Sequence, residues 1–108
     1  MPQYIVIASH DAGQCPGANA KMGEVLQQIV PTLESIGQKH GIKRVAGPLH
    51  LDPTHQLLTL LEAPSADAVM DALNENRMMH VQNCQVFRAT PLDELMKKSE
   101  TLGQQPLY

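Results

Sequence analysis

Aromatic side chains are scarce in this sequence, which contains no tryptophan, one phenylalanine and two tyrosines. Proteins that bind single-stranded nucleic acid by stacking need several exposed aromatic rings, so the composition argues against such a platform. Hydrophobic residues nevertheless make up 43% of the chain, which is a folding composition and not a disordered one. We therefore expect an aliphatic core in which methionines fill the gaps.

An excess of positive charge and long apolar runs are also absent from the sequence. The formal net charge is -3, and the only adjacent basic pairs are Lys43-Arg44 and Lys97-Lys98, so there is no basic stripe for a phosphate backbone. No run is long enough to span a membrane, and the start of the chain lacks the basic region of a signal peptide. We expect a soluble cytoplasmic protein with neither a nucleic acid nor a membrane as its partner.

The 108 residues contain two cysteines, Cys15 and Cys84. A reducing compartment argues against a disulfide between them. The length corresponds to one domain, residues 1–108, with one core.

The first half of the chain predicts a strand, a helix and a hairpin. Residues 3–10 form a β-branched apolar run without helical period, which is typical of a buried strand. Asn19 is a suitable cap for a helix that ends near Gly41, and Pro31 should kink or break that helix. Residues 42–50 and 55–62 are expected to form an antiparallel hairpin, with the proline of Gly47-Pro48 indicating an edge strand or a bulge.

The second half predicts a helix, a strand and a final helix. Ser65 is the expected cap of the second helix, which should end before Val81. Residues 84–90 are expected to form the fourth strand, which Pro91 ends. Residues 92–102 form a short amphipathic pattern, and residues 103–108 are expected to be a tail.

The order of elements is therefore βαββαβ with a C-terminal helix, which is typical of an α+β, ferredoxin-like fold. Right-handed crossovers favour an antiparallel sheet in the order 4-1-3-2 with two helices on one face. We expect the other face to carry Tyr4, Val6, Ala8 and either Leu57 or Leu58. Such a face would be a large apolar patch in a monomer, so the sequence predicts a homodimer in which two sheets pack together.

The length, this order of elements and the segment Leu61-Glu62-Ala63-Pro64-Ser65 resemble the dimeric α/β-barrel superfamily of small bacterial proteins. The resemblance covers roughly residues 3–97 and includes monooxygenase-like, YCII-like, GYD-like and muconolactone-isomerase-like proteins. It implies a barrel formed by two sheets. No specific family motif is matched, so it assigns no catalytic residue.

The predicted topology gathers imidazole and thiol groups at one end of the sheet. His10 closes the first strand at this end, and His40 is expected at the opposite end. The other residues expected beside His10 are Cys15, His50, His55, His80 and Cys84. Imidazole and thiolate are ligands that zinc and copper prefer, and we predict a site formed by His10 with Cys15, His55 and His80. His50 is more simply a turn residue and Cys84 a small buried hydrophobe.

Three functional hypotheses remain open on the sequence alone. The first is a binding protein for a divalent transition metal, zinc or copper. The second is a cofactor-independent monooxygenase-like or isomerase-like enzyme, with a small organic molecule in the barrel cavity and His10 as its base. The third is a structural or interaction domain. A Cys15–His10 nucleophile pair is a further possibility, although an ordinary loop cysteine is the simpler interpretation. No nucleotide or flavin is expected, because no phosphate-binding loop is present.

Overall fold

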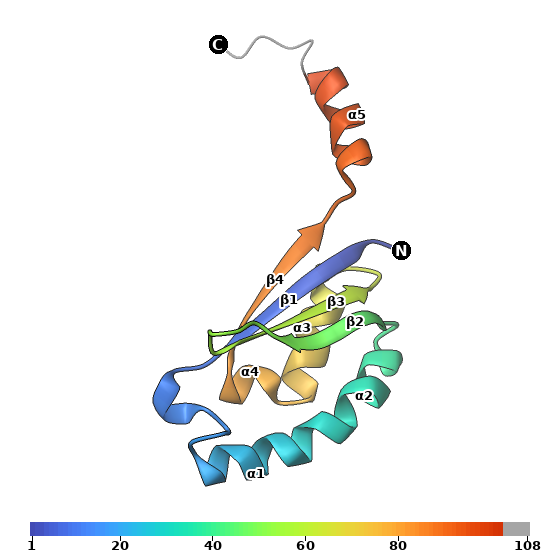
Figure 1. Ribbon diagram of the computed structural model, residues 1–108. Helices are drawn as coiled ribbons and strands as arrows, with labels where there is room; N and C mark the ends of the chain where they lie inside the picture. The colour runs from blue at the N-terminus through green and yellow to red at the C-terminus, as the bar shows by residue number, and fades with distance from the viewer. Residues whose placement is uncertain (103–108) are drawn as a thin grey trace.

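The computed structural model describes residues 1–102 of the chain, with side chains to residue 98. The predicted tail, residues 103–108, lies outside the described residues. A four-stranded sheet is flanked by helices on one face, and the last helix stands clear of the sheet (Figure 1). The elements in order are β1 (Gln3–Ser9), η1 (Ala12–Gln14), α1 (Ala20–Ile29), η2 (Val30–Thr32), α2 (Leu33–Lys39), β2 (Lys43–His50), β3 (Gln56–Glu62), α3 (Ala66–Glu75), α4 (Met78–Val81), β4 (Asn83–Ala89) and α5 (Leu92–Leu102).

The sheet has the order β2-β3-β1-β4, and each neighbouring pair is antiparallel. This confirms the predicted order, written from the other edge. β1 lies in the middle, with Val6 opposite Thr59 of β3 and Val86 of β4. Because β1 is central, the residue that follows it, His10, emerges between the ends of two neighbouring strands.

The predicted helix caps and the proline break are confirmed. The second helix, expected to be continuous and to end before Val81, is instead divided into α3 and α4, and α4 ends at Val81. The Asn19 side chain accepts a hydrogen bond from the Met22 N–H at 3.1 Å and so caps α1. Ser65 caps α3 in the same way, through the Ala68 N–H at 3.1 Å. Pro31 lies in the 3₁₀ turn η2 that separates α1 from α2, because proline removes a helical donor and clashes with the preceding turn.

The core lies between the sheet and the helices. Alternate residues of β1, namely Tyr4, Val6 and Ala8, are buried on the helix-covered face. Tyr4 and Val6 pack there with Ala63 and with Val69 of α3, which is 1% exposed. Burying a side chain of this size contributes about 1.5–3 kcal/mol.

The expectation that Tyr4, Val6 and Ala8 form the open face of the sheet is therefore wrong. The open face carries the other set of alternate residues in β1, Ile5 and Ile7. Directly opposite strand partners share a face, and the register places these residues beside Leu58, Leu60 and Phe87. The open face of the sheet is therefore apolar, as expected, but its β1 residues are Ile5 and Ile7 instead of the predicted set.

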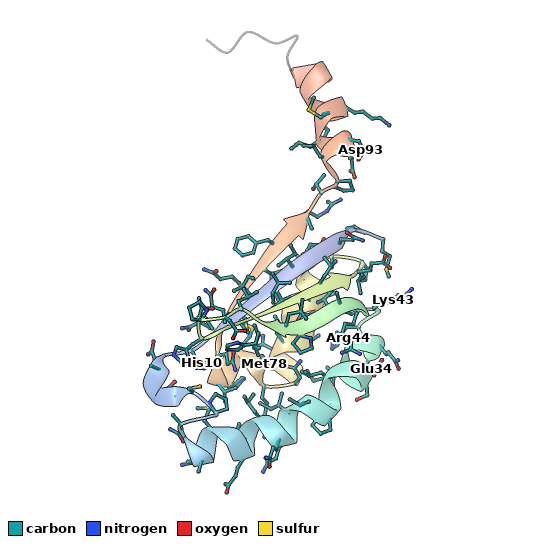
Figure 2. The ribbon with its side chains drawn as sticks, in the orientation of Figure 1. His10, Glu34, Lys43, Arg44, Met78 and Asp93 are labelled. Carbon is teal, nitrogen blue, oxygen red and sulfur yellow. The ribbon has the colours of Figure 1, made fainter. Side chains whose placement is uncertain are left out.

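Two residues separate β4 from α5, which extends away from the sheet (Figure 1). Side chains fill the space between the sheet and the helices, whereas Asp93 on α5 lies far from this layer (Figure 2). The described part of the chain contains no helix with both the length and the apolar character needed to cross a membrane.

Candidate metal site

Two histidines meet where β1 and β3 adjoin. The ladder between the two strands ends with Ser9 opposite Gln56. One step beyond it, the His10 N–H donates to the His55 carbonyl oxygen at 3.2 Å. The two imidazole rings have their centroids 5.3 Å apart and are tilted by 56°. The backbone pairing of β1 with β3 therefore sets the spacing of these two rings.

Cys15 returns to the same place through a tight turn. The 3₁₀ helix η1 is closed by the Gln14 N–H bonding the Asp11 oxygen at 2.9 Å and by the Cys15 N–H bonding the Ala12 oxygen at 3.2 Å. The Asn19 amide, which caps α1, also donates to the Gly13 oxygen at 3.4 Å. This loop therefore folds back over the end of β1 and positions its thiol beside the two rings.

His10, Cys15 and His55 form a compact cluster of three ligand-type groups. One donor atom from each of them lies within 4.8 Å of the other two. His10 and Cys15 are partly buried and His55 is exposed, so the cluster is open to solvent on one side. In a tetrahedral site with metal–ligand bonds of about 2.0–2.3 Å, neighbouring donors are about 3.4–3.8 Å apart. The 4.8 Å limit on the three groups is wider than that spacing, so a bound ion would draw the donors closer together.

The His10 ring has no hydrogen-bond partner among the residues that the structure describes. Its Nδ1 and Nε2 atoms are both buried, and neither has a partner among the described residues. An unsatisfied buried polar group costs about 1–3 kcal/mol, so buried ring nitrogens are normally paired. A metal ion bound to one of the two ring nitrogens would give that nitrogen a partner.

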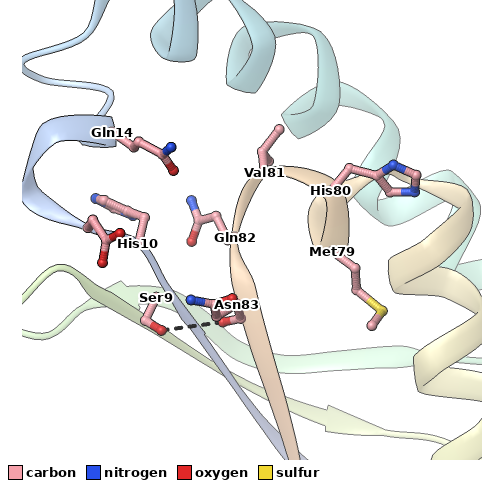
Figure 3. Close-up of a pocket in the computed structure, with 9 residues that line it drawn as sticks. Ser9, His10, Gln14, Met79, His80, Val81, Gln82 and Asn83 are labelled. Carbon is pink, nitrogen blue, oxygen red and sulfur yellow. Dashed lines mark hydrogen bonds between the residues drawn. The ribbon is translucent and has the colours of Figure 1, made fainter.

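Gln82 also has a buried polar atom without a partner among the described residues, and the sequence analysis did not identify it. Its side chain is 6% exposed, and its Oε1 is buried without a partner in the part of the chain that the structure describes. Gln82, Gln14 and His10 lie around one hollow, as Figure 3 shows. The hollow has a volume of about 140 Å³. The hollow is lined by Ser9, His10, Asp11, Gln14, Met79, His80, Val81, Gln82 and Asn83. A glutamine has no metal-ligand signature, so a search for imidazole, thiol and carboxylate groups passes over it.

His80, the fourth predicted ligand, does not join the cluster. It is exposed at the end of α4, and its ring points away from His10 (Figure 3). The cause is local: Arg77 has a left-handed backbone, with φ 67°, between α3 and the short helix α4. α4 therefore turns the His80 ring away from His10, although His80 still lines the same hollow.

The remaining cysteine and histidines have other surroundings. Burial raises the pKa of the Cys84 thiol, which favours the neutral thiol over the thiolate that binds metals. His50 Nδ1 lies 2.6 Å from Asp52 Oδ1 within the exposed hairpin turn, in keeping with a turn residue. His40 Nε2 lies 3.6 Å from Glu75 Oε2 between α2 and α3, at the other end of the sheet as expected.

A scan against protein-family models found no matching family, and a search of curated proteins found no significantly similar sequence. The function of this chain is therefore inferred from the geometry of its own residues.

Proposed function

We propose that the protein binds one divalent transition-metal ion, zinc or copper, through His10, Cys15 and His55. The observation that carries this proposal is the convergence of three donor atoms within 4.8 Å of one another. Two imidazoles and one thiolate form a donor set that both metals accept. The unpartnered ring nitrogens of His10 support it, because a bound ion would satisfy one of them.

Three protein ligands leave the fourth tetrahedral position open. Structural zinc sites use four protein ligands, whereas sites that bind water or a substrate keep one position free. His55 is exposed, so a small molecule from solvent can reach an ion held here. The proposed site is therefore one for exchangeable binding of the ion or of an additional ligand.

The alternative function is a cofactor-independent enzyme with His10 as base and a small organic molecule in the barrel cavity between two sheets. Within one chain, the space beside His10 is the hollow described above. Pockets for small organic ligands usually enclose about 300–1,000 Å³ and are mostly apolar. The hollow has about 140 Å³ and is lined largely by polar residues. Within one chain, its size and polarity therefore favour solvent or a very small polar molecule over an organic substrate.

We also propose that the chain works as a homodimer in the cytoplasm, with the paired sheets of the dimeric α/β-barrel superfamily that the sequence resembles. The open sheet face supports this, because monomers seldom expose a large apolar patch. A reducing compartment suits the site as well, since Cys15 is a free cysteine and must remain a thiolate to bind a metal.

Cobalt substitution tests the metal site directly. We expect Co²⁺ to bind in a one-to-one ratio and to produce a near-ultraviolet thiolate-to-cobalt charge-transfer band, because Cys15 is one of the ligands. Cys15→Ser should abolish this band. Cys84→Ser is the matched control, since Cys84 is the other free cysteine, and it should leave the band intact. No cobalt binding by the wild-type protein, or a band that depends on Cys84, would contradict the proposal.

We expect Gln82 to raise the metal affinity of the site without being a ligand itself. A metal-bound histidine usually donates its second N–H to a nearby acceptor, and losing that acceptor weakens metal binding about 10–100-fold. We expect the bound His10 to donate toward Gln82 Oε1, directly or through water in the hollow. Gln82→Leu should therefore lower cobalt affinity by about that factor, as measured by competition with a chelator.

The stability of the metal-free protein separates this role from a packing role. Gln82→Leu removes a buried acceptor that has no partner among the described residues, so we expect the unfolding free energy without metal to stay level or rise. Asn83→Ala, an exposed change in the same hollow, should leave the cobalt affinity unaltered. A loss of stability in Gln82→Leu with no loss of affinity would show that Gln82 serves packing alone.

A further inference from the structure

α5 is an arm that leaves the body of the protein. It follows β4 after only Thr90 and Pro91 and stands clear of the sheet (Figure 1). It also leaves from the end of the sheet opposite His10, because Ala89 of β4 pairs with Gln3, at the start of β1. An interaction made by α5 is therefore independent of the proposed metal site.

The arm carries an apolar stripe. Leu92, Leu95 and Met96 are 71%, 50% and 57% exposed, and their i, i+3, i+4 spacing places them on one face of the helix. Glu94 and Lys97 lie on the opposite face. Isolated helices shorter than about 12–15 residues are marginal in water, and α5 has 11 residues. A helix of this length and pattern is stabilised by packing its apolar face against another surface.

The open sheet face is a second uncovered apolar surface on the same chain. Phe87 and Leu49 are 51% and 53% exposed. The register places Phe87 opposite Ile5, and Leu49 opposite Leu58, on this face. The helices of the body all lie on the other side of the sheet (Figure 1).

We propose that α5 of one copy packs its stripe of Leu92, Leu95 and Met96 against the open sheet face of a second copy, beside Phe87, and that the exchange is reciprocal. One chain supplies both apolar surfaces, so a two-fold pair covers both on each copy at once. The short connection through Pro91 carries α5 away from its own sheet and toward a neighbour. The arms add to the sheet-to-sheet contact of the proposed dimer by closing over its margin.

Sedimentation equilibrium on two charge-matched double variants tests this arm exchange. Leu95→Gln/Met96→Gln removes the stripe, whereas Glu94→Gln/Lys97→Gln changes the opposite face; neither alters the net charge, and glutamine suits a helix as well as the residues replaced. We expect the first variant to raise the dimer dissociation constant by at least about 100-fold, because four large apolar side chains per dimer lose their cover. The second variant should dissociate like wild type.

The outcomes distinguish the arm from the dimer and from the metal site. Equal dissociation constants for both variants and wild type would overturn the arm exchange while leaving a sheet-to-sheet dimer intact. A monomeric wild type would overturn both the arm and the dimer, and the cobalt experiment would be unaffected.

A photo-crosslinking amino acid at position 95 then identifies the surface that α5 contacts. We expect crosslinks between copies, mapped to the open face near Phe87. Crosslinks within one chain, or crosslinks to the groove along α1 lined by Leu26, Val30 and Pro31, would overturn the proposal.

Discussion

His10→Ala is expected to weaken binding of Zn²⁺ or Co²⁺ by at least about 100-fold, which exceeds the usual effect of losing an outer-shell group. The residue supplies one of only three donors in the cluster, so its loss leaves two ligands. Calorimetric titration of wild type and variant measures the change directly.

The fold should survive this substitution. Neither ring nitrogen of His10 has a hydrogen-bond partner among the described residues, so the alanine variant loses no side-chain hydrogen bond. The backbone bond from the His10 N–H to His55 is kept. We therefore expect the melting temperature of the metal-free variant to stay within a few degrees of wild type, corresponding to about 1 kcal/mol or less.

His80→Ala is the informative control for this experiment. The sequence places His80 among the ligands, whereas the structure turns it away from His10. Wild-type affinity in His80→Ala is the expected result. A loss in His80→Ala as large as that in His10→Ala would show that α4 reorients when the metal binds. A wild-type protein without measurable affinity would shift the assignment of His10 to the alternative, a catalytic base.

Much of the architecture could be predicted because its signals are local. Asn19 and Ser65 both act as helix caps, and Pro31 breaks the first helix, since capping and proline geometry depend on neighbouring residues alone. The strand order followed from the order of elements and the handedness of crossovers. These rules do not depend on which side chains meet in the core.

The face of each strand could not be predicted because β1 is apolar at successive positions. Tyr4, Ile5, Val6, Ile7 and Ala8 give no polar alternation, so the sequence fits burial of either face. The structure buries Tyr4, Val6 and Ala8 and leaves Ile5 and Ile7 on the open face. Contacts with residues far along the chain, among them Ala63 and Val69, settle this choice.

The ligands that lie at or next to strand ends could be predicted from the order of the strands. His10 and His55 flank the β1–β3 pairing, and Cys15 follows in the next loop, so topology alone brings them to one end. His80 depends instead on the direction of α4, which the left-handed Arg77 sets. No propensity signals a left-handed arginine, since this conformation is uncommon outside glycine, asparagine and aspartate.

Gly47→Ala is expected to destabilise the protein by about 3 kcal/mol, which is the largest stability loss expected here for a single substitution. Gly47 has φ 95°, a conformation that L side chains rarely adopt. A Cβ atom there would lie 2.5 Å from the Leu58 carbonyl oxygen and 3.1 Å from the Thr59 Cα. Both atoms belong to the backbone of β3, which cannot rotate away. Left-handed strain of about 1–2 kcal/mol and overpacking of about 1–3 kcal/mol together give the expected loss.

We expect Gly47→Ala in the edge strand β2 to affect the metal site as well. β2 can relieve the contact only by separating from β3, and this hairpin leads through its turn to His55. We therefore expect Gly47→Ala to lower both the unfolding free energy in urea and the cobalt affinity.

Gly13→Ala is the matched control: a Cβ at Gly13 meets nothing within 4 Å, although this glycine lies in the turn before Cys15. It should leave stability within about 0.5 kcal/mol of wild type. Equal urea midpoints for the two variants would show that β2 has room at Gly47, and a normal cobalt affinity in a destabilised Gly47→Ala would show that His55 is held independently of β2.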